Sequence, residues 1–452
     1  MEKNIFFPKG DFFHSIIAKI LGYKWLLIFF AVFLVAQLIQ ISFLPWDSIP
    51  YIFQGKWFCG EQVYLEFIRP PLPGVVNCIL GAEIYSILFS TALACVLYFF
   101  AVFRFYKKEK EVLDQFTFAL FVFLFPIILL SSNFGSDLFA LSFLLLALSV
   151  TTPLKKGLFF GLATLSRYNF ILFLPVFLWE MRKSFKKIHL FLIPIVLLWL
   201  PWLIFNFLYA GDPLFSVNET VYLNVLTKGV WAPLGLNELC FFILLLGVLV
   251  FSNLKKNLSK PLNQSAIISI IQFIFSGIKE SRFIILTVPA FALSISRISF
   301  DNKNAKLFFM GLFALIAAFI LLSFIFIYTA DINKVFYSGE VPTDSFLFNC
   351  KVASDKWVLF YPHGIVAQIL PDENRYEEYL SGGTNLVIYN YSSLNLASYE
   401  GEVIKRENYV ILKSQTCAPQ PKKYISGPWS YKVIKWLRDT NSKLVDTADW
   451  PE

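Results

Sequence analysis

One acidic side chain, Asp47, follows directly on the first apolar segment of the chain, within the sequence L-P-W-D-S-I-P-Y of residues 44–51. Because residues 25–44 are long and apolar enough to span a bilayer, the sequence predicts that Asp47 is held at a membrane surface. A carboxylate placed there can take a proton from an acceptor hydroxyl group. Asp47 is therefore the predicted catalytic base. The alternative interpretation is a solvated acid that caps a short loop helix.

Several further charged residues are predicted to lie on the same side of the membrane as Asp47. Cations at that depth would neutralise a lipid phosphate and stabilise it as a leaving group, with arginine suited to bidentate phosphate contacts. This chemistry fits a phosphate-linked substrate carried by a lipid. The predicted substrate-binding residues are Lys56, Arg69, Asp137, Arg167, Lys279, Glu280 and Arg282.

Five of these residues also have a plainer interpretation. Asp137 is equally a cap for the helix that it begins, and Arg167 is long enough to reach the lipid headgroups. Glu280 and Arg282 would form a local ion pair at a turn, and Lys56 would be an ordinary solvated loop residue.

The composition is that of a membrane protein with many spans. Hydrophobic residues make up 57% of the chain and charged residues only 15%, whereas a soluble domain carries about a quarter charged residues. The net charge of +8 does not indicate nucleic-acid binding, because the lysines cluster beside apolar runs, as the positive-inside bias predicts for cytoplasmic loops. These clusters lie at residues 107–110, 155–156, 182–187, 255–260 and 303–306.

The elements that would position the site follow from the apolar runs and the lysine clusters. With the N-terminus inside, we expect about eleven membrane segments, beginning with residues 25–44, 84–103, 116–132 and 136–151. Residues 157–180 have basic clusters at both ends, so a single crossing would invert every later loop. We expect instead a hairpin of two short helices with Arg167 near its tip, below the outer surface. Residues 265–296 repeat the pattern with residues 279–282 at the tip, and a last span at 307–328 leads outside.

The composition changes after residue 330 to that of a soluble domain. Residues 356–362, 385–391 and 407–413 are predicted strands, and residues 373–380 a helix between the first two, which makes one βαβ unit. A late helix is expected at residues 429–437. If this domain lies outside the cytoplasm, Cys350 and Cys417 are candidates for a disulfide, with Cys59 and Cys78 as a second candidate pair.

The motifs resemble the GT-C membrane glycosyltransferases, which include protein mannosyltransferases and the lipid A aminoarabinose transferase. The resemblance rests on Asp47 after the first span, on Y-x-x-x-G and then Y-L-E-F-x-R-P-P-L-P in the following loop, and on three later stretches in the family's order. The later stretches are S-N-F-G-S-D-L-F-A-L at residues 132–141, G-L-A-T-L-S-R-Y-N at 161–169 and E-S-R-F-I-I-L-T-V-P-A-F-A-L at 280–293. They cover roughly residues 25–330.

The resemblance implies an inverting glycosyl transfer with Asp47 as base, the donor phosphate on Lys56, Arg69, Arg167 and Arg282, and Asp137 positioning the substrate. Ser48 stands where many members carry a second acid, which argues against a tightly held divalent metal. No cofactor or nucleotide is expected.

The sequence as a whole therefore predicts an α-helical polytopic protein of the cytoplasmic membrane. Residues 1–330 would form a GT-C-like catalytic domain, and residues 331–452 a small α/β domain outside. The expected partners are a polyprenyl or dolichyl phosphate sugar, an acceptor of unknown class and membrane lipids. Two alternatives remain: a ligase acting on polyprenyl diphosphate glycans, and a transporter or flippase, for which the buried charges would line a path.

Overall fold

The computed structural model describes most of the helical region and the C-terminal sheet. The described residues are 22–42, 48–60, 65, 67–109, 114–129, 136–221, 260–275, 285, 287–297, 311, 344–356, 360, 365, 367–370, 373–389, 391, 394, 399, 401–406 and 409–420. Asp47, Lys279, Glu280 and Arg282 lie outside these ranges, as do the span expected at residues 307–328, apart from residue 311, and the helix expected at 429–437.

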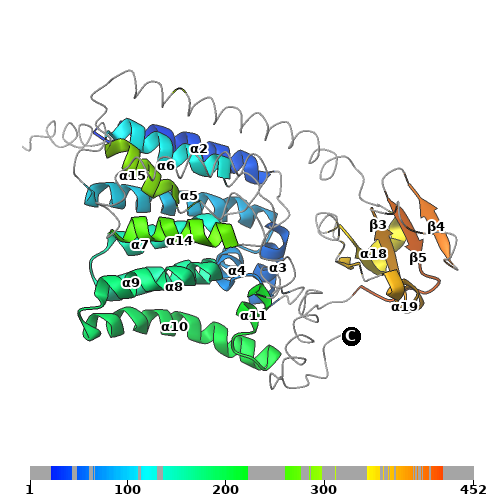
Figure 1. The fold of residues 1–452 in the computed structure, drawn as a ribbon. Helices are drawn as coiled ribbons and strands as arrows, with labels where there is room; N and C mark the ends of the chain where they lie inside the picture. The colour runs from blue at the N-terminus through cyan, green and yellow to red at the C-terminus, as the bar shows by residue number, and fades with distance from the viewer. Residues whose placement is uncertain are drawn as a thin grey trace, which may run out of the picture.

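Long apolar helices form most of the described structure and lie side by side (Figure 1). Two of them, α5 and α10, are long and apolar enough to cross a membrane. Only 17% of the most apolar stretch of α10 is buried against the rest of the protein, and Leu197 and Leu208 on it are 62% and 71% exposed. Such an apolar surface is stable when it faces lipid. The helices expected from the apolar runs are α2 (Lys24–Ser42), α5 (Ile84–Lys108), α6 (Gln115–Leu129), α7 (Ser136–Ser149), α10 (Phe185–Ala210), α14 (Pro261–Phe275) and α15 (Thr287–Arg297).

The predicted helical hairpin around Arg167 is confirmed. Its arms are α8 (Pro153–Ser166) on one side, and the 3₁₀ turn η1 (Tyr168–Phe173) with α9 (Leu174–Met181) on the other. Lys156 forms an ion pair with Glu180, and the rings of Phe160 and Phe177 lie 5.0 Å apart. Lys156 near the start of α8 meets Glu180 near the end of α9, so the two arms run antiparallel. Arg167 lies between the arms, where the chain reverses direction.

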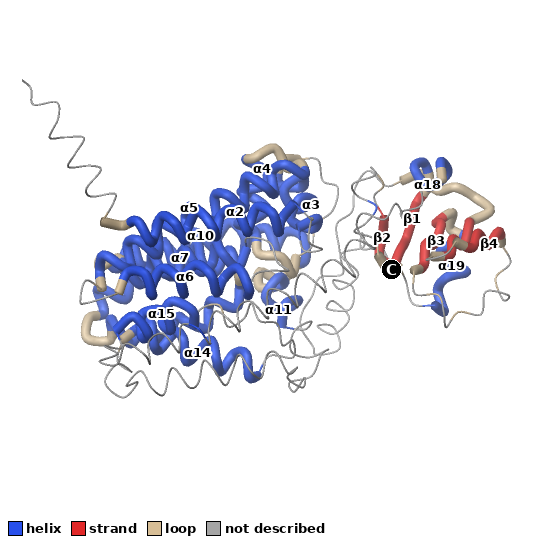
Figure 2. Tube along the Cα trace, turned by 90° about the horizontal axis from the view of Figure 1, so that it is seen from above, coloured by secondary structure: helices blue, strands red, loops and turns tan. Residues whose placement is uncertain are grey.

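Three short helices gather at one end of the long helices, as both views show (Figures 1 and 2). They are α3 (Ser48–Phe58), α4 (Pro71–Ile79) and α11 (Phe215–Val221). A disulfide between Cys59 and Cys78, with a Cα–Cα distance of 5.4 Å, ties the end of α3 to α4. The candidate pair in the first loop is thus confirmed.

Basic residues mark the opposite end. Lys107 and Lys108 end α5, and the Lys108 ammonium donates to the Leu148 carbonyl at the end of α7, at 2.7 Å. Lys156 and the cluster at residues 182–187 lie where α8 begins and where α9 gives way to α10. The lysine clusters in this part of the chain therefore share one end of the helices, away from α3, α4 and α11.

The C-terminal strands form a five-stranded mixed sheet in the order β2-β1-β3-β5-β4. The strands are β1 (Lys351–Ser354), β2 (Ala367–Ile369), β3 (Thr384–Ile388), β4 (Glu402–Lys405) and β5 (Val410–Lys413). Strands β1 and β3 pair in parallel, with Val352 opposite Asn385, and helix α19 (Tyr376–Ser381) precedes β3. The helix and the second strand of the predicted βαβ unit are therefore present, but β2 comes between β1 and α19 in the chain. The strand predicted at residues 356–362 is wrong at the positions that the structure describes: Lys356 forms a turn with Asp355, Phe360 is not in a strand, and β1 lies just before them.

The two faces of the sheet have different neighbours. Leu386 and Ile388 pack with Tyr376 of α19 on one face. On the other face, Val387 belongs to the same hydrophobic cluster as Ile49 of α3. Nearly every side chain of α3 is buried, so this helix needs apolar neighbours on all sides. The cluster with Val387 supplies some of these neighbours.

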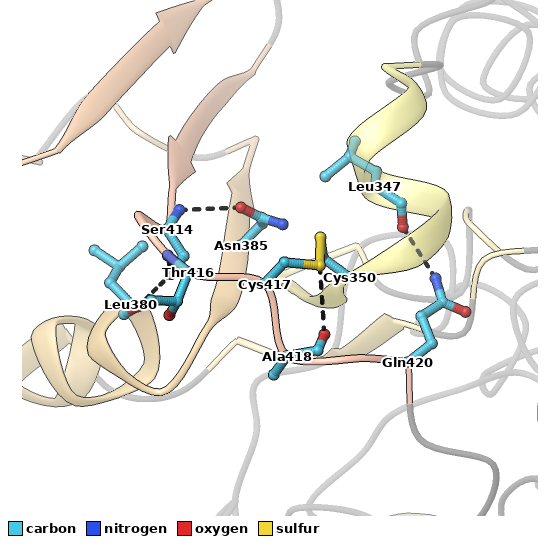
Figure 3. The surroundings of a disulfide bond; sticks show 9 residues. All are labelled: Leu347, Cys350, Leu380, Asn385, Ser414, Thr416, Cys417, Ala418 and Gln420. Carbon is cyan, nitrogen blue, oxygen red and sulfur yellow. Dashed lines mark hydrogen bonds between the residues drawn. A yellow bond between two sulfur atoms is a disulfide. The ribbon is translucent and has the colours of Figure 1, made fainter.

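The other candidate disulfide, between Cys350 and Cys417, is also confirmed, with a Cα–Cα distance of 5.1 Å (Figure 3). It joins the residue before β1 to the segment that follows β5. Gln420 donates from its amide to the Leu347 carbonyl at 3.0 Å, and the Ser414 backbone N–H donates to the Asn385 side chain at 3.0 Å. These bonds hold the end of the described chain against its beginning at the sheet.

Candidate functional site

Arg167 and Asp137 form a buried ion pair at the tip of the α8–α9 hairpin. The Arg167 Nε donates to Asp137 Oδ1 at 2.5 Å, and the two side chains are only 16% and 3% exposed. Asp137 is the second residue of α7, so its carboxylate lies at a helix N-terminus as well as beside a cation. The guanidinium group contacts this carboxylate, and Arg167 is thus held in place within the protein.

Arg69 lies just before α4, in the first loop. Its guanidinium carbon is 5.4 Å from the centre of the Tyr51 ring, within the range of a cation–π interaction. Its backbone carbonyl accepts a hydrogen bond from the Gln54 side-chain amide at 3.0 Å. Gly74 lets α4 approach that amide, since an added Cβ would lie 2.5 Å from Gln54 Oε1. Helices α3 and α4 thus position Arg69 from both sides.

Tyr168 connects the two arginines. Its hydroxyl group donates to the Arg69 carbonyl at 3.3 Å and accepts from the Trp202 indole N–H at 2.8 Å. Because Tyr168 follows Arg167 directly in the chain, the bond to Arg69 places the first loop beside the hairpin tip. Arg69, Arg167 and Asp137 are therefore brought together in one region, whereas the sequence had placed them only on the same face of the membrane.

Helix α11, in the loop that follows α10, contacts both α10 and the first loop near Arg69. The Ser216 hydroxyl donates to the Asn206 side chain of α10 at 2.5 Å, and the Thr220 hydroxyl donates to the Ile68 carbonyl at 3.4 Å. Between them, Glu219 is only 1% exposed. Sequence reasoning missed Glu219 and Tyr168. The R-Y-N triplet after the hairpin arm pointed to Tyr168, but nothing in the loop after residue 211 pointed to Glu219.

An apolar groove with a volume of about 270 Å³ lies between α4, α8 and α10. Two of its lining residues are close to the arginines in sequence: Pro71 is two residues after Arg69, and Leu165 is two residues before Arg167. Gly157 allows α8 and α10 to meet closely, since an added Cβ would lie 1.9 Å from the Phe191 carbonyl oxygen. The lining residues are Phe58, Pro71, Leu72, Val75, Leu165, Leu198, Pro201, Trp202 and Phe205.

Lys56 lies in the last turn of α3. Its ammonium group forms an ion pair with Glu83, at 2.7 Å, near the start of α5. The Lys56 side chain is 13% exposed and that of Glu83 is 61% exposed. Lys56 thus links α3 to the segment before α5.

The described residues contain no group of three or more His, Cys, Asp or Glu side chains that could hold a metal ion. Asp137 is paired with Arg167, and a carboxylate that shares its charge with a guanidinium is a poorer metal ligand. The expected independence of a metal stays a prediction.

No protein-family model and no curated protein sequence matches the chain. Two solved structures do match. One is ArnT from Cupriavidus metallidurans in the apo state, with a TM-score of 0.54 and 13% identity over 88% of this chain and 100% of that one. The other is the same protein bound to undecaprenyl phosphate, with a TM-score of 0.56 and 14% identity over 88% of this chain and 99% of that one. The chain has the ArnT fold.

ArnT is a lipid A aminoarabinose transferase and a GT-C glycosyltransferase. The fold expected from the resemblance is thus confirmed over most of the chain, with its helical part and its small sheet. The expected count of about eleven membrane segments is not confirmed, because two of the described helices meet the requirements of a full span.

Proposed function

We propose that this protein is an inverting glycosyltransferase that moves a sugar from a polyprenyl or dolichyl phosphate to an acceptor at the outer face of the membrane. The observation that carries the proposal is the bond from Tyr168, the neighbour of Arg167, to the backbone of Arg69, beside an apolar groove whose lining includes Pro71 and Leu165. The groove suits an isoprenoid chain, and the arginines suit the phosphate at its head. An ArnT structure holds undecaprenyl phosphate, a ligand with both of these parts.

In the proposed reaction, the Asp47 carboxylate takes the proton of an acceptor hydroxyl or amine as that atom attacks the anomeric carbon of the sugar. The bond between this carbon and the phosphate oxygen breaks, and the electron pair leaves with the polyprenyl phosphate. The leaving phosphate gains negative charge, which Arg69 and Arg167 stabilise. Asp137 fixes the orientation of the Arg167 guanidinium. Lys279, Glu280 and Arg282 stay candidates for the donor site, and Lys56 is a candidate for the loop that borders it.

The proposed outer location rests on charge and on cysteine chemistry. Both disulfides need an oxidising compartment, and one of them lies at the end of the helices that carries α3, α4 and α11. The lysine clusters lie at the other end, which the positive-inside bias assigns to the cytoplasm. We therefore propose a protein of the cytoplasmic membrane with its N-terminus inside, a catalytic domain of residues 1–330 and an outer domain of residues 331–452.

The test measures consumption of labelled polyprenyl-phosphate sugars by the purified protein in lipid, with a membrane extract as the source of acceptors. Wild type is compared with Asp47→Asn and with Asp344→Asn, which changes an acid of the C-terminal part that pairs with Arg406. We expect wild type and Asp344→Asn to consume a donor and Asp47→Asn to lose about a thousandfold in rate. Unchanged consumption by Asp47→Asn would remove Asp47 as the base. A folded wild-type protein that consumes no donor would favour the transporter alternative.

A further inference from the structure

The corner between α9 and α10 combines exposed cations with exposed aromatic rings. All four basic residues of the segment 182–187 are exposed. Trp179, in the last turn of α9, is 58% exposed, and Phe185, the first residue of α10, is 79% exposed. The Arg182 guanidinium carbon lies 4.1 Å from the centre of the Trp179 ring, and its Nη1 donates to the Trp179 carbonyl at 2.8 Å. Such a pair suits a membrane surface, where the ring meets acyl chains and the charge meets headgroups.

Helix α8 brings a further exposed cation, Lys155, to the same level. Gly157 of α8 lies against Phe191 of α10, and further along both helices Thr164 is bonded to Trp199. The two helices therefore run parallel and begin side by side. Because Lys155 comes two residues before Gly157, it lies beside the first turns of α10.

Exposed apolar side chains follow these cations along both helices. Ile193 on α10 is 49% exposed, and Leu158 on α8 is 40% exposed. Such side chains are stable against the acyl chains of lipids. The boundary between the apolar and the polar part of the bilayer therefore lies near the start of α8 and α10, and the cations lie at the level of the headgroups.

The acidic residues of this part of the sequence do not balance the cations. Glu180 is the only acid in residues 138–211, and its carboxylate pairs with Lys156. Lys155 and the segment 182–187 bring five further cations to the surface. Each lysine or arginine near a membrane surface strengthens binding of anionic lipid about fivefold. A phosphatidylcholine headgroup has no net charge and gains little from this attraction.

We propose that this basic corner, defined as Lys155, Trp179 and residues 182–187, binds the headgroup phosphates of anionic phospholipids such as phosphatidylglycerol. The ammonium and guanidinium groups contact the phosphates, and the rings of Trp179 and Phe185 lie against the acyl chains. Bound lipid fixes the depth of α8, α9 and α10 in the bilayer. The basic corner lies at the end of the hairpin away from Arg167, so the proposal does not depend on glycosyl transfer.

The test adds equal amounts of phosphatidylglycerol and phosphatidylcholine to the full-length protein in a neutral detergent and counts the retained lipids by native mass spectrometry. Wild type should retain phosphatidylglycerol over phosphatidylcholine by at least about tenfold. The triple variant Lys183→Gln, Lys186→Gln and Lys187→Gln should retain the two lipids almost equally, and salt should weaken the preference of wild type. Equal retention of both lipids by wild type would overturn the proposal.

Two control variants separate the charge of the corner from its fold and its place. Arginine at the same three positions keeps the charge and should keep the preference. Lys351→Gln with Lys405→Gln removes cations from the sheet and should leave the preference unchanged. A preference that survives in the triple glutamine variant, or that is lost in the arginine or the sheet variant, would overturn the basic corner as the site. Inorganic phosphate should not displace the lipid, and displacement would overturn a phospholipid as its ligand.

Discussion

Arg167 and Asp137 show how a charged side chain is kept within a largely apolar helical region. Either group alone would leave an ion far from bulk water, and such a loss of hydration costs several kcal/mol. Together they exchange that hydration for a direct contact of 2.5 Å. The pair also joins the start of α7 to the tip of the α8–α9 hairpin, so it determines the position of one of the two arginines of the site.

Removing one member of this pair should destabilise the protein more than removing both. Arg167→Met leaves the Asp137 carboxylate without its contact to Arg167, and we expect a loss of about 3–5 kcal/mol of stability. The double variant Arg167→Met with Asp137→Asn removes both charges and should recover part of that loss. Thermal unfolding of the three variants in detergent measures the difference. A double variant whose loss equals the sum of the single losses would contradict this account of the pair.

The sequence identifies single residues as candidates for the site, but it does not identify their partners. Arg167 was identified as a site residue because an arginine at membrane depth needs a reason. Its partner lies 30 residues earlier, and no local spacing connects the two. Glu219 was missed for the same cause, since its burial depends on how α11 packs on α10 and on the first loop. Lys56 was assigned to the donor site, and its bond to Glu83 was not foreseen.

At the scale of elements, the wall of the groove depends on how closely α8 approaches α10. Two glycines on α8 face α10, and the Trp199 indole N–H donates across the gap to the Thr164 hydroxyl at 2.8 Å. Membrane helices associate through small residues because lipid offers little hydrophobic driving force between them. The closeness of these two helices fixes where Leu165 and Trp202 line the groove.

The two glycines should differ in their tolerance of a methyl group. A Cβ at residue 157 would meet the Phe191 backbone oxygen at 1.9 Å, whereas one at residue 161 would meet Leu198 Cδ1, the end of a flexible side chain, at 2.8 Å. We expect Gly157→Ala to lose about 2–3 kcal/mol and Gly161→Ala less than about 1.5 kcal/mol. Unfolding of both variants under the same conditions gives the comparison. Equal losses would mean that α8 and α10 separate easily.

The disulfide between Cys59 and Cys78 should support the site as well as the fold. It closes a loop over a separation of 19 residues, and Arg69 lies within that loop. Replacing both cysteines by serine should cost about 3 kcal/mol and raise the KM for the donor, because Arg69 is then held less firmly. The matched control replaces Cys350 and Cys417, which should destabilise the sheet without changing that KM. An unchanged KM in the first variant would show that Tyr168 and Gln54 suffice to hold Arg69.

The helices were easier to predict than the strands, for a physical reason. A long apolar run has to be a helix in a membrane, so the bounds expected for α2, α5 and α7 agree with the structure within a few residues. Short strands have no such constraint. The run K-W-V-L-F-Y-P has higher strand propensity than K-V-A-S, yet K-V-A-S forms β1, because pairing with β2 and β3 decides the matter.

The molecule as a whole has two chemically different ends. In the part of the chain that the structure describes, one end of the helices carries the lysines of residues 107–108, 155–156 and 182–187, and the other carries the short helices, a disulfide and Arg69 with Arg167. Charge and redox state thus indicate the same orientation by independent routes.

Labelling of single introduced cysteines in intact cells tests this orientation. Glu402→Cys lies in the sheet and Lys183→Cys lies between α9 and α10, and both positions are exposed. A thiol reagent that cannot cross membranes should label the first variant in intact cells and the second only after lysis, because the two sites lie on opposite faces. Labelling of residue 183 in intact cells would reverse the proposed orientation.

The disulfide between Cys350 and Cys417 has a mechanical consequence. It spans 67 residues and joins the point where the chain enters the sheet to the point where it leaves β5, and the Lys351 backbone N–H adds a bond to the Ala418 carbonyl at 2.7 Å. A pulling force applied to the two flanking segments passes through the sulfur atoms instead of through the strands. The sheet would stay folded under tension that pulls on the chain from either side, and reduction of this one bond would remove that protection.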